Sequence, residues 1–389
     1  KHLDQQPIAS ITAFLGSGTT HDDPVRLPEN AGKSFVGSYI LGMGFTFDDT
    51  DKSGESSPIA EMERILQANP ASREVILPYI GGSEVNTSPT HAHHRYVINF
   101  GERSEEECRR RWPELMAIVE AKVKPSRAHL TTNAIGIKRA KFWWQYGSLA
   151  KEMFSAIDRL DRVLAICRHQ PNWAVGFLTS SAVFAESLVI FPLPTYAAFC
   201  ALQARPHELW ARFFGSSMKD DLRYTPSDCF ETFPFPEGFE SHPALEATGQ
   251  AYYEFRANLM IKNNQGLTST YNRFHDPSER DPAILELRRL HDLMDVAVLA
   301  AYGWTDLQPS LDFVLDYEED EDSSSRKKKP FRYRWVDSFQ EEVLARLLDL
   351  NASRSLTSSS PSRSPRPSRK PPPSTPSSSP DPSDFLPFS

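Results

Sequence analysis

Cysteine is scarce in this sequence, and its few copies are far apart. Cys108, Cys167, Cys200 and Cys229 are the 4 cysteines among 389 residues, and no two of them form a C-x-x-C pair. This spacing argues against a zinc ribbon and against a disulfide scaffold, since both need closely or regularly spaced cysteines. Cys167 and Cys200 lie in apolar stretches and are predicted to be small core residues. A reducing cytoplasm is the predicted location.

Long apolar runs are also missing. The longest is near Leu188–Phe191, far too short to cross a bilayer, so no membrane partner is expected. The sequence begins with Lys rather than Met, and residues 1–6 do not resemble a signal peptide. We therefore expect a fragment, or a reading frame opened midway through a longer gene.

Sequence motifs for several kinds of catalysis are absent too. Residues 14–20 are rich in glycine, as in a cofactor-binding turn, but acids and prolines follow where a helix should start. The consecutive prolines at 371–373 have no aromatic residue after them, so no Asn-Pro-Pro-aromatic loop can grip a flipped base. No G-x-S-x-G nucleophile turn occurs. The sequence therefore predicts neither catalytic nor cofactor-binding residues.

A group of histidines raises the alternative of a metal site. His91, His93 and His94, with Glu84 nearby, are of metal-ligand type, but their spacing fits none of the helical metal patterns. On a strand, His91 and His93 would share one face while His94 faces away. We predict no metal site, and Glu84 is as well explained by a structural pair with Arg95.

The net charge of −8 hides an uneven distribution. Acids at 316–322 stand next to a basic run at 326–329, so the average neither supports nor excludes DNA binding. Basic residues also precede aromatic ones at 109–112, at 138–146 and at 219–224. Such residues can contact phosphates, read guanine edges and stack on bases. The alternative is that the tryptophans are core and the arginines a solvated helix face.

Apolar periodicity and capping residues predict a mixture of strands and helices. Ser104 and Glu107 have the spacing of a helix start, and Pro206 is expected to kink or split a long helix. Residues 215–236 are predicted to be irregular. The predicted strands are 8–15, 36–41, 75–80, 96–100, 162–167, 173–178 and 186–191. The predicted helices are 61–68, 104–123, part of 138–159, 196–214, 243–261, 282–301 and 338–350.

These elements predict a mixed α/β fold. Residues 31–238 are expected to form a domain of strands with flanking helices, and residues 239–352 a mainly helical C-terminal domain. Residues 1–30 are interpreted as a linker or the remnant of another domain. From residue 353 the composition turns to Ser, Pro and Arg, which buries too little apolar surface to fold, so 353–389 is predicted to be a disordered tail.

Residues 215–237 resemble the end of the target-recognition domain in single-chain type IIG restriction–modification proteins and their adenine-N6 methyltransferase relatives. There a helix ends, a Lys- or Arg-bearing loop with an Arg-Tyr-Ser/Thr element follows, and an aromatic-Pro-aromatic-Pro stretch closes the domain. The matching residues here are Lys219, Arg223, Tyr224, Thr225 and 233–236. Other similar segments are 32–49, 78–100, 271–281 and 301–308, so the resemblance covers about 32–351.

The resemblance implies recognition of double-stranded DNA within a site-specific adenine-N6 methyltransferase. In that family the S-adenosylmethionine turn and the catalytic loop lie upstream, so they would belong to a missing N-terminal methyltransferase domain. No cofactor is expected to bind this chain alone, and whether it is itself an enzyme stays open. The alternative is a non-catalytic specificity subunit or interaction module acting in trans. The resemblance makes Lys219, Arg223 and Tyr224 the first candidates for DNA contact, and Arg95 and Asn86 are secondary ones.

Overall fold

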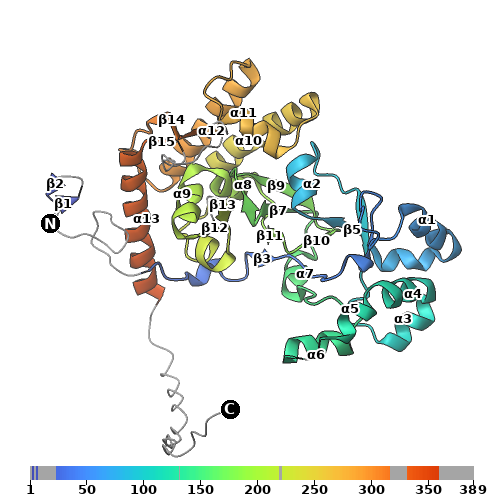
Figure 1. Ribbon diagram of the computed structural model, residues 1–389. Helices are drawn as coiled ribbons and strands as arrows, with labels where there is room; N and C mark the ends of the chain where they lie inside the picture. Colours follow the sequence, from blue (N-terminus) through green and yellow to red (C-terminus); the bar gives the residue numbers. More distant parts are fainter. Residues whose placement is uncertain are drawn as a thin grey trace, which may run out of the picture. The chain divides into compact units, whose positions relative to one another are not determined.

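The computed structural model describes residues 2–3, 6–7, 23–130, 132–218, 221–315 and 331–358 (Figure 1). All of them belong to one compact unit, 1–358. The predicted strand at 8–15, Lys219, the acidic and basic runs at 316–329 and residues 359–389 of the predicted tail lie outside the described residues.

Two four-stranded sheets form the framework, in the orders β3-β11-β7-β9 and β10-β5-β6-β4. The first is antiparallel throughout, whereas β10 and β5 of the second are parallel. Smaller sheets join β12-β13-β8, β14-β15 and β1-β2. The strands are β1 (His2–Leu3), β2 (Gln6–Pro7), β3 (Phe35–Val36), β4 (Thr46–Phe47), β5 (Ile76–Ile80), β6 (Arg95–Ile98), β7 (Arg162–Cys167), β8 (His169–Gln170), β9 (Val175–Thr179), β10 (Val183–Phe184), β11 (Leu188–Phe191), β12 (Ser216–Met218), β13 (Asp221–Arg223), β14 (Leu311–Leu315) and β15 (Phe331–Trp335).

Helices pack around both sheets (Figure 1). Short 3-10 turns lie at Pro28–Asn30 (η1), Met43–Phe45 (η2) and Pro70–Glu74 (η3), and a π-helical turn (η4) lies at Pro226–Phe230. The α-helices are α1 (Ile59–Ala68), α2 (Gly82–Thr87), α3 (Glu105–Arg111), α4 (Pro113–Lys122), α5 (Lys124–Ala128), α6 (Ala134–Lys141), α7 (Lys151–Ile157), α8 (Tyr196–Gln203), α9 (Arg205–Phe214), α10 (Pro243–Asn263), α11 (Leu267–Phe274), α12 (Pro282–Ala301) and α13 (Asp337–Ser358).

The first sheet lies at the centre of the larger of two hydrophobic cores. Strand β11 is buried along its whole length, as expected for a continuous run of β-branched and large apolar residues. The same core takes in residues of α8, α10, α12 and α13, so it extends across the domain boundary predicted at residue 238. The helical C-terminal region therefore shares one interior with the central sheet.

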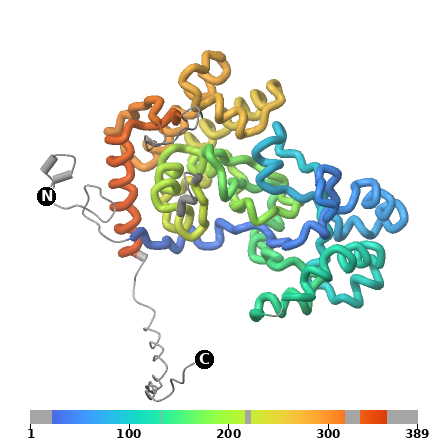
Figure 2. Tube along the Cα trace, viewed as in Figure 1, coloured from blue at the N-terminus to red at the C-terminus, as the bar shows by residue number. Residues whose placement is uncertain are grey.

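The second sheet has its own core. We call residues 40–149, which supply most of that core, the α3–α6 lobe. Its interior contains Phe45, Val97, Trp112 and Trp143, and helices α1, α3 and α4 contribute to it. Figure 2 shows the segment from residue 23, in blue, running from α13 towards this lobe. The segment is fixed at its start, where the Val25 amide donates to Asn351 Oδ1 at 3.0 Å.

Local sequence patterns proved accurate for many elements. Ser104 caps α3 by accepting a hydrogen bond from the Glu107 amide, and the long helix predicted at 196–214 divides at Ala204, just before Pro206. Helix α12 has the predicted bounds. The mixed α/β class is confirmed. All four cysteines are free and buried. No helix among the described ranges is long and apolar enough to span a membrane.

Other elements differ from the expectation. Helix α13 continues to Ser358, so residues 353–358 are helical where the tail was predicted to start. Helices α2 and α11 were not predicted, and neither were the hairpins β12–β13 and β14–β15. The first of these hairpins lies inside the stretch 215–236, which was predicted to be irregular. It is also the part of the chain where the DNA-contact candidates are concentrated.

Candidate nucleic-acid interface

A short antiparallel hairpin follows helix α9 directly. Strands β12 and β13 pair so that Ser216 lies opposite Arg223. The chain leaves α9 at Gly215, where a Cβ atom would lie only 2.4 Å from the carbonyl oxygen of Ala211, so no larger residue fits. Strand β8 pairs with the other side of β13 and places His169 opposite Arg223. Two distant parts of the sequence thereby form one three-stranded sheet.

Two arginines of this sheet keep unused hydrogen-bonding capacity. Arg223 is half-buried, and within the described part of the chain its Nε atom has no partner. Arg168, next to β8, donates to Tyr39 Oη at 3.1 Å and to the Glu186 carbonyl at 3.2 Å, while its Nε atom is also without a partner there. Those Nε atoms are buried, so only the outer nitrogens of a guanidinium group could reach a phosphate or a guanine. Sequence inspection missed Arg168, because only the pairing of β8 with β13 brings it to this sheet.

Tyr224 lies in the core and not on the surface. The residue is 0% exposed, and its hydroxyl group is 3.0 Å from His207 Nε2. Its backbone amide donates to the Arg168 carbonyl at 2.8 Å, which ties the end of β13 to the start of β8. The expectation of a direct DNA contact by Tyr224 is not met in this conformation, since neighbouring strand residues point to opposite faces.

His207 and several aromatic rings form a rigid base beneath the hairpin. The ring centroids of Phe233 and Phe235 lie 4.5 and 5.4 Å from that of His207. Burial lowers the pKa of His207 to about 3, so the imidazole is neutral at pH 7. The aromatic-Pro-aromatic-Pro stretch at 233–236 thus has a packing role. It gives the hairpin a fixed platform, which a recognition element needs for defined contacts.

Arg95 is engaged by a buried carboxylate. Its Nε atom donates to Glu84 Oε1 at 2.6 Å and its Nη2 atom to Glu84 Oε2 at 3.0 Å. Glu84 also accepts from the Gly81 amide at the start of α2. Burial acts to raise the pKa of Glu84, but the hydrogen bonds and charge of Arg95 outweigh it and lower that pKa. The structural pair considered from the sequence is confirmed. Asn86 is half-buried and borders a small cleft beside β8.

The three histidines of the metal alternative have separate environments. His91 is buried, and its Nδ1 atom is 3.0 Å from the Val85 carbonyl. His93 packs against Tyr96, and His94 Nδ1 is 3.2 Å from Glu84. Ligand-type side chains do gather elsewhere, at His291, Asp292 and Asp295, where the guanidinium of Arg205 pairs with both carboxylates.

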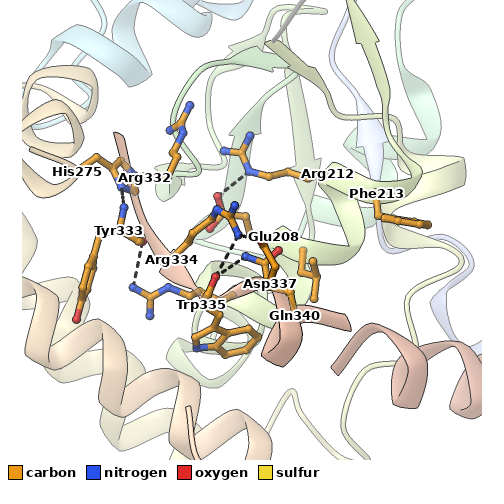
Figure 3. Close-up of a pocket in the computed structure, with 12 residues that line it drawn as sticks. Glu208, Arg212, Phe213, His275, Arg332, Tyr333, Arg334, Trp335, Asp337 and Gln340 are labelled. Carbon is orange, nitrogen blue, oxygen red and sulfur yellow. Dashed lines mark hydrogen bonds and ion pairs between the residues drawn. The ribbon is translucent and has the colours of Figure 1, made fainter. Parts of the chain in front are cut away.

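A cavity of about 260 Å³ between α9, β15 and α13 is the site drawn in Figure 3. Four arginines line it, as an anion site would require. Each guanidinium already has an acceptor, however. The cavity therefore lies where these elements pack together and is not an anion site. The pairs are Arg205 with Asp292 and Asp295, Arg212 with Glu208, Arg334 with Asp337, and Arg332 with Asn172.

Comparison with known proteins finds one family and one shared fold. Residues 56–237 match the family model described as "MmeI, target recognition domain". A solved structure of the Type IIL restriction–modification enzyme MmeI in complex with DNA is similar to this chain, with a TM-score of 0.58 and 16% identity. The likeness covers 90% of this chain and 39% of that one, and at this identity it shows a shared fold. No curated protein matches the sequence.

Proposed function

We propose that this chain, whose residues 56–237 form a target recognition domain of the MmeI type, reads a short asymmetric site in duplex DNA through the sheet β12-β13-β8. One observation carries the proposal: this sheet holds Arg223 half-buried beside the buried Tyr224, and among the described residues its guanidinium forms no ion pair. An arginine in that state can donate two parallel hydrogen bonds to guanine O6 and N7 in the major groove. Discrimination against other bases follows, because they lack that acceptor pair.

Each candidate residue has a defined role in the proposal. Arg223 reads a base edge, and Lys219, which lies outside the described residues, contacts a phosphate. Tyr224 is a positioning residue, since its hydroxyl is bonded to His207 inside the core. Asn86 borders the sheet and contacts the DNA from its edge. Arg95 contributes its remaining donor capacity only, because Glu84 already holds two of its nitrogens.

Recognition serves methyl transfer carried out elsewhere. A methyltransferase domain of the same protein would bind S-adenosylmethionine and flip one adenine of the site for methylation at N6. This chain would fix the register of the DNA so that the adenine reaches that pocket. It would act in the cytoplasm, where the DNA and the cofactor are found.

Substitution of Arg223 tests the proposal. Arg223→Ala should relax one position of the recognised site and cost about 1–3 kcal/mol in binding to it, since one bidentate base contact is lost. Binding of a randomised duplex library, followed by sequencing of the bound fraction, measures the change. Arg289→Ala is the control, because Arg289 is paired with Glu286 on α12, away from the hairpin. An unchanged sequence preference in Arg223→Ala would remove Arg223 from base recognition.

A further inference from the structure

Helix α6 presents a group of cations that have no carboxylate partners. Lys138 and Lys141 are exposed and Arg139 is half-buried, and within the described ranges none of the three forms an ion pair. The helix also exposes Ile135 and Ile137, at 70% and 55% of their maximum. Uncompensated charge beside exposed apolar side chains is unusual on a solvated helix, and it marks a surface that binds something.

A groove of about 840 Å³ runs along this helix. Lys138, Arg139 and Tyr39 are among the residues that line it. The groove also contains Lys151, which pairs with Glu102, and Glu152. These three cations and two carboxylates leave a net charge of +1 on the groove wall. Lys141, on the same helix, adds a further positive charge beside it.

Tyr39 connects the groove to the recognition sheet. Its hydroxyl accepts a hydrogen bond from Arg168, whose neighbour His169 pairs with Arg223 in the next strand. Arg139, Arg168 and Arg223 lie along this connection. A line of cations therefore leads from α6 to the hairpin.

We propose that this line of cations is a binding track for the sugar–phosphate backbone of duplex DNA, with Lys138, Arg139 and Lys141 as phosphate contacts at its far end. The inference rests on the proposed function, because it extends the DNA contact beyond the hairpin. Phosphate groups supply the acceptors that the three side chains lack, and such contacts fix the register of a reader without reading sequence. The exposed isoleucines fit beside the phosphates, against sugars or base steps.

The salt dependence of duplex binding tests the track. Each phosphate contact by Lys or Arg contributes about 0.9 to the slope of log K against log salt. The triple variant Lys138→Gln/Arg139→Gln/Lys141→Gln of the whole chain should therefore lose about 2.7 of that slope. Its affinity should fall equally for all duplex sequences, because phosphates carry no sequence information.

A matched control removes the same charge from the same lobe. Arg109→Gln/Arg111→Gln/Lys124→Gln also deletes three cations, but each of these is paired with glutamates. This control should keep the wild-type slope. A triple α6 variant that binds duplex with an unchanged slope would overturn the track alone, and would leave α6 to a protein partner. A wild-type chain that binds no duplex even at low salt would overturn the proposed function and the track together.

Discussion

The α3–α6 lobe contains two basic runs that look alike in sequence and differ in structure. On α3, Arg109 pairs with Glu105 at 2.7 Å, and Arg111 pairs with Glu107 at 3.2 Å. On α6, the basic residues have no such partners among those described. The difference arises four residues upstream, because α3 carries a glutamate at i−4 of each arginine while α6 begins Ala-Ile-Gly-Ile. Local acids therefore decide whether a basic run is a solvated face or a binding surface.

The same comparison explains how a chain of net charge −8 can bind a polyanion. Several arginines at the surface of the described ranges are paired with a nearby Glu or Asp, as Arg64 is with Glu61 and Arg109 with Glu105. In the proposed function, the cations that DNA would meet are those of α6 and the arginines of the hairpin sheet. The average charge carries no information about them, since binding depends on the local field.

Removal of the buried carboxylate of Glu84 should have the largest effect on the free energy of unfolding. Arg95 is paired like the α3 arginines, but its partner Glu84 has a fully buried side chain. Glu84→Gln leaves a partly buried guanidinium without its counter-charge, so we expect a loss of about 3 kcal/mol in the free energy of unfolding. Urea denaturation followed by far-UV circular dichroism measures it. A loss no larger than that of Glu105→Gln, an exposed partner on α3, would show that burial adds nothing to this pair.

The effect of Glu84→Gln should also depend on pH. The pKa of Glu84 is lowered from its ordinary value of 4.5 because Arg95 outweighs the burial that acts to raise it. A lowered carboxyl pKa adds stability that is complete above pH 4.5 and is lost as the pH falls through the lower pKa. The difference in the free energy of unfolding between wild type and Glu84→Gln should therefore become smaller below pH 4.5. A difference that grows on acidification would contradict an ionised pair of Glu84 and Arg95.

Loss of the exposed α3 pairs should have a smaller effect, and it separates the two runs. Arg109→Gln/Arg111→Gln breaks ion pairs with surface glutamates, which contribute little because water and salt screen them. We expect a small drop in the urea midpoint, a minor fraction of that for Glu84→Gln. The triple α6 variant should show no drop, since it breaks no ion pair. If the α6 variant were the less stable of the two, the α6 cations would stabilise the fold, and their proposed role in binding a ligand would lose its support.

Much of the framework could be predicted from local patterns, and the interface could not. Some signals depend only on residues a few positions away in the sequence. Examples are the helix cap at Ser104, the break before Pro206 and the apolar run of β11. Strands β12 and β13 are short and polar, and they exist because β8, about 50 residues upstream, pairs with one of them. No periodicity within 216–223 reveals that pairing.

The candidate residues show the same limit. Arg223 and Tyr224 are neighbours in an Arg-Tyr-Thr element, and the resemblance assigned both to DNA. Arg223 ends β13 and is half-buried, whereas Tyr224, the next residue, enters the core. The pair of Glu84 with Arg95 could be anticipated from charge alone. The cations of α6 were noticed with their aromatic neighbours, but their lack of partners required the structure.

Replacement of Ile135 should have the smallest effect and resolves what α6 does besides attract phosphates. The side chain is 70% exposed, so Ile135→Ser should leave the free energy of unfolding unchanged. If the side chain packs against DNA, part of its apolar surface is buried on binding, and affinity should fall by about threefold. The salt slope should not change, because no charge is removed. Ile261→Ser, at an exposed position of α10, is the control and should bind DNA as wild type does. Equal affinities for Ile135→Ser and wild type would restrict α6 to a purely electrostatic contact, and would widen its contrast with the hairpin, for which hydrogen bonds to a base are proposed.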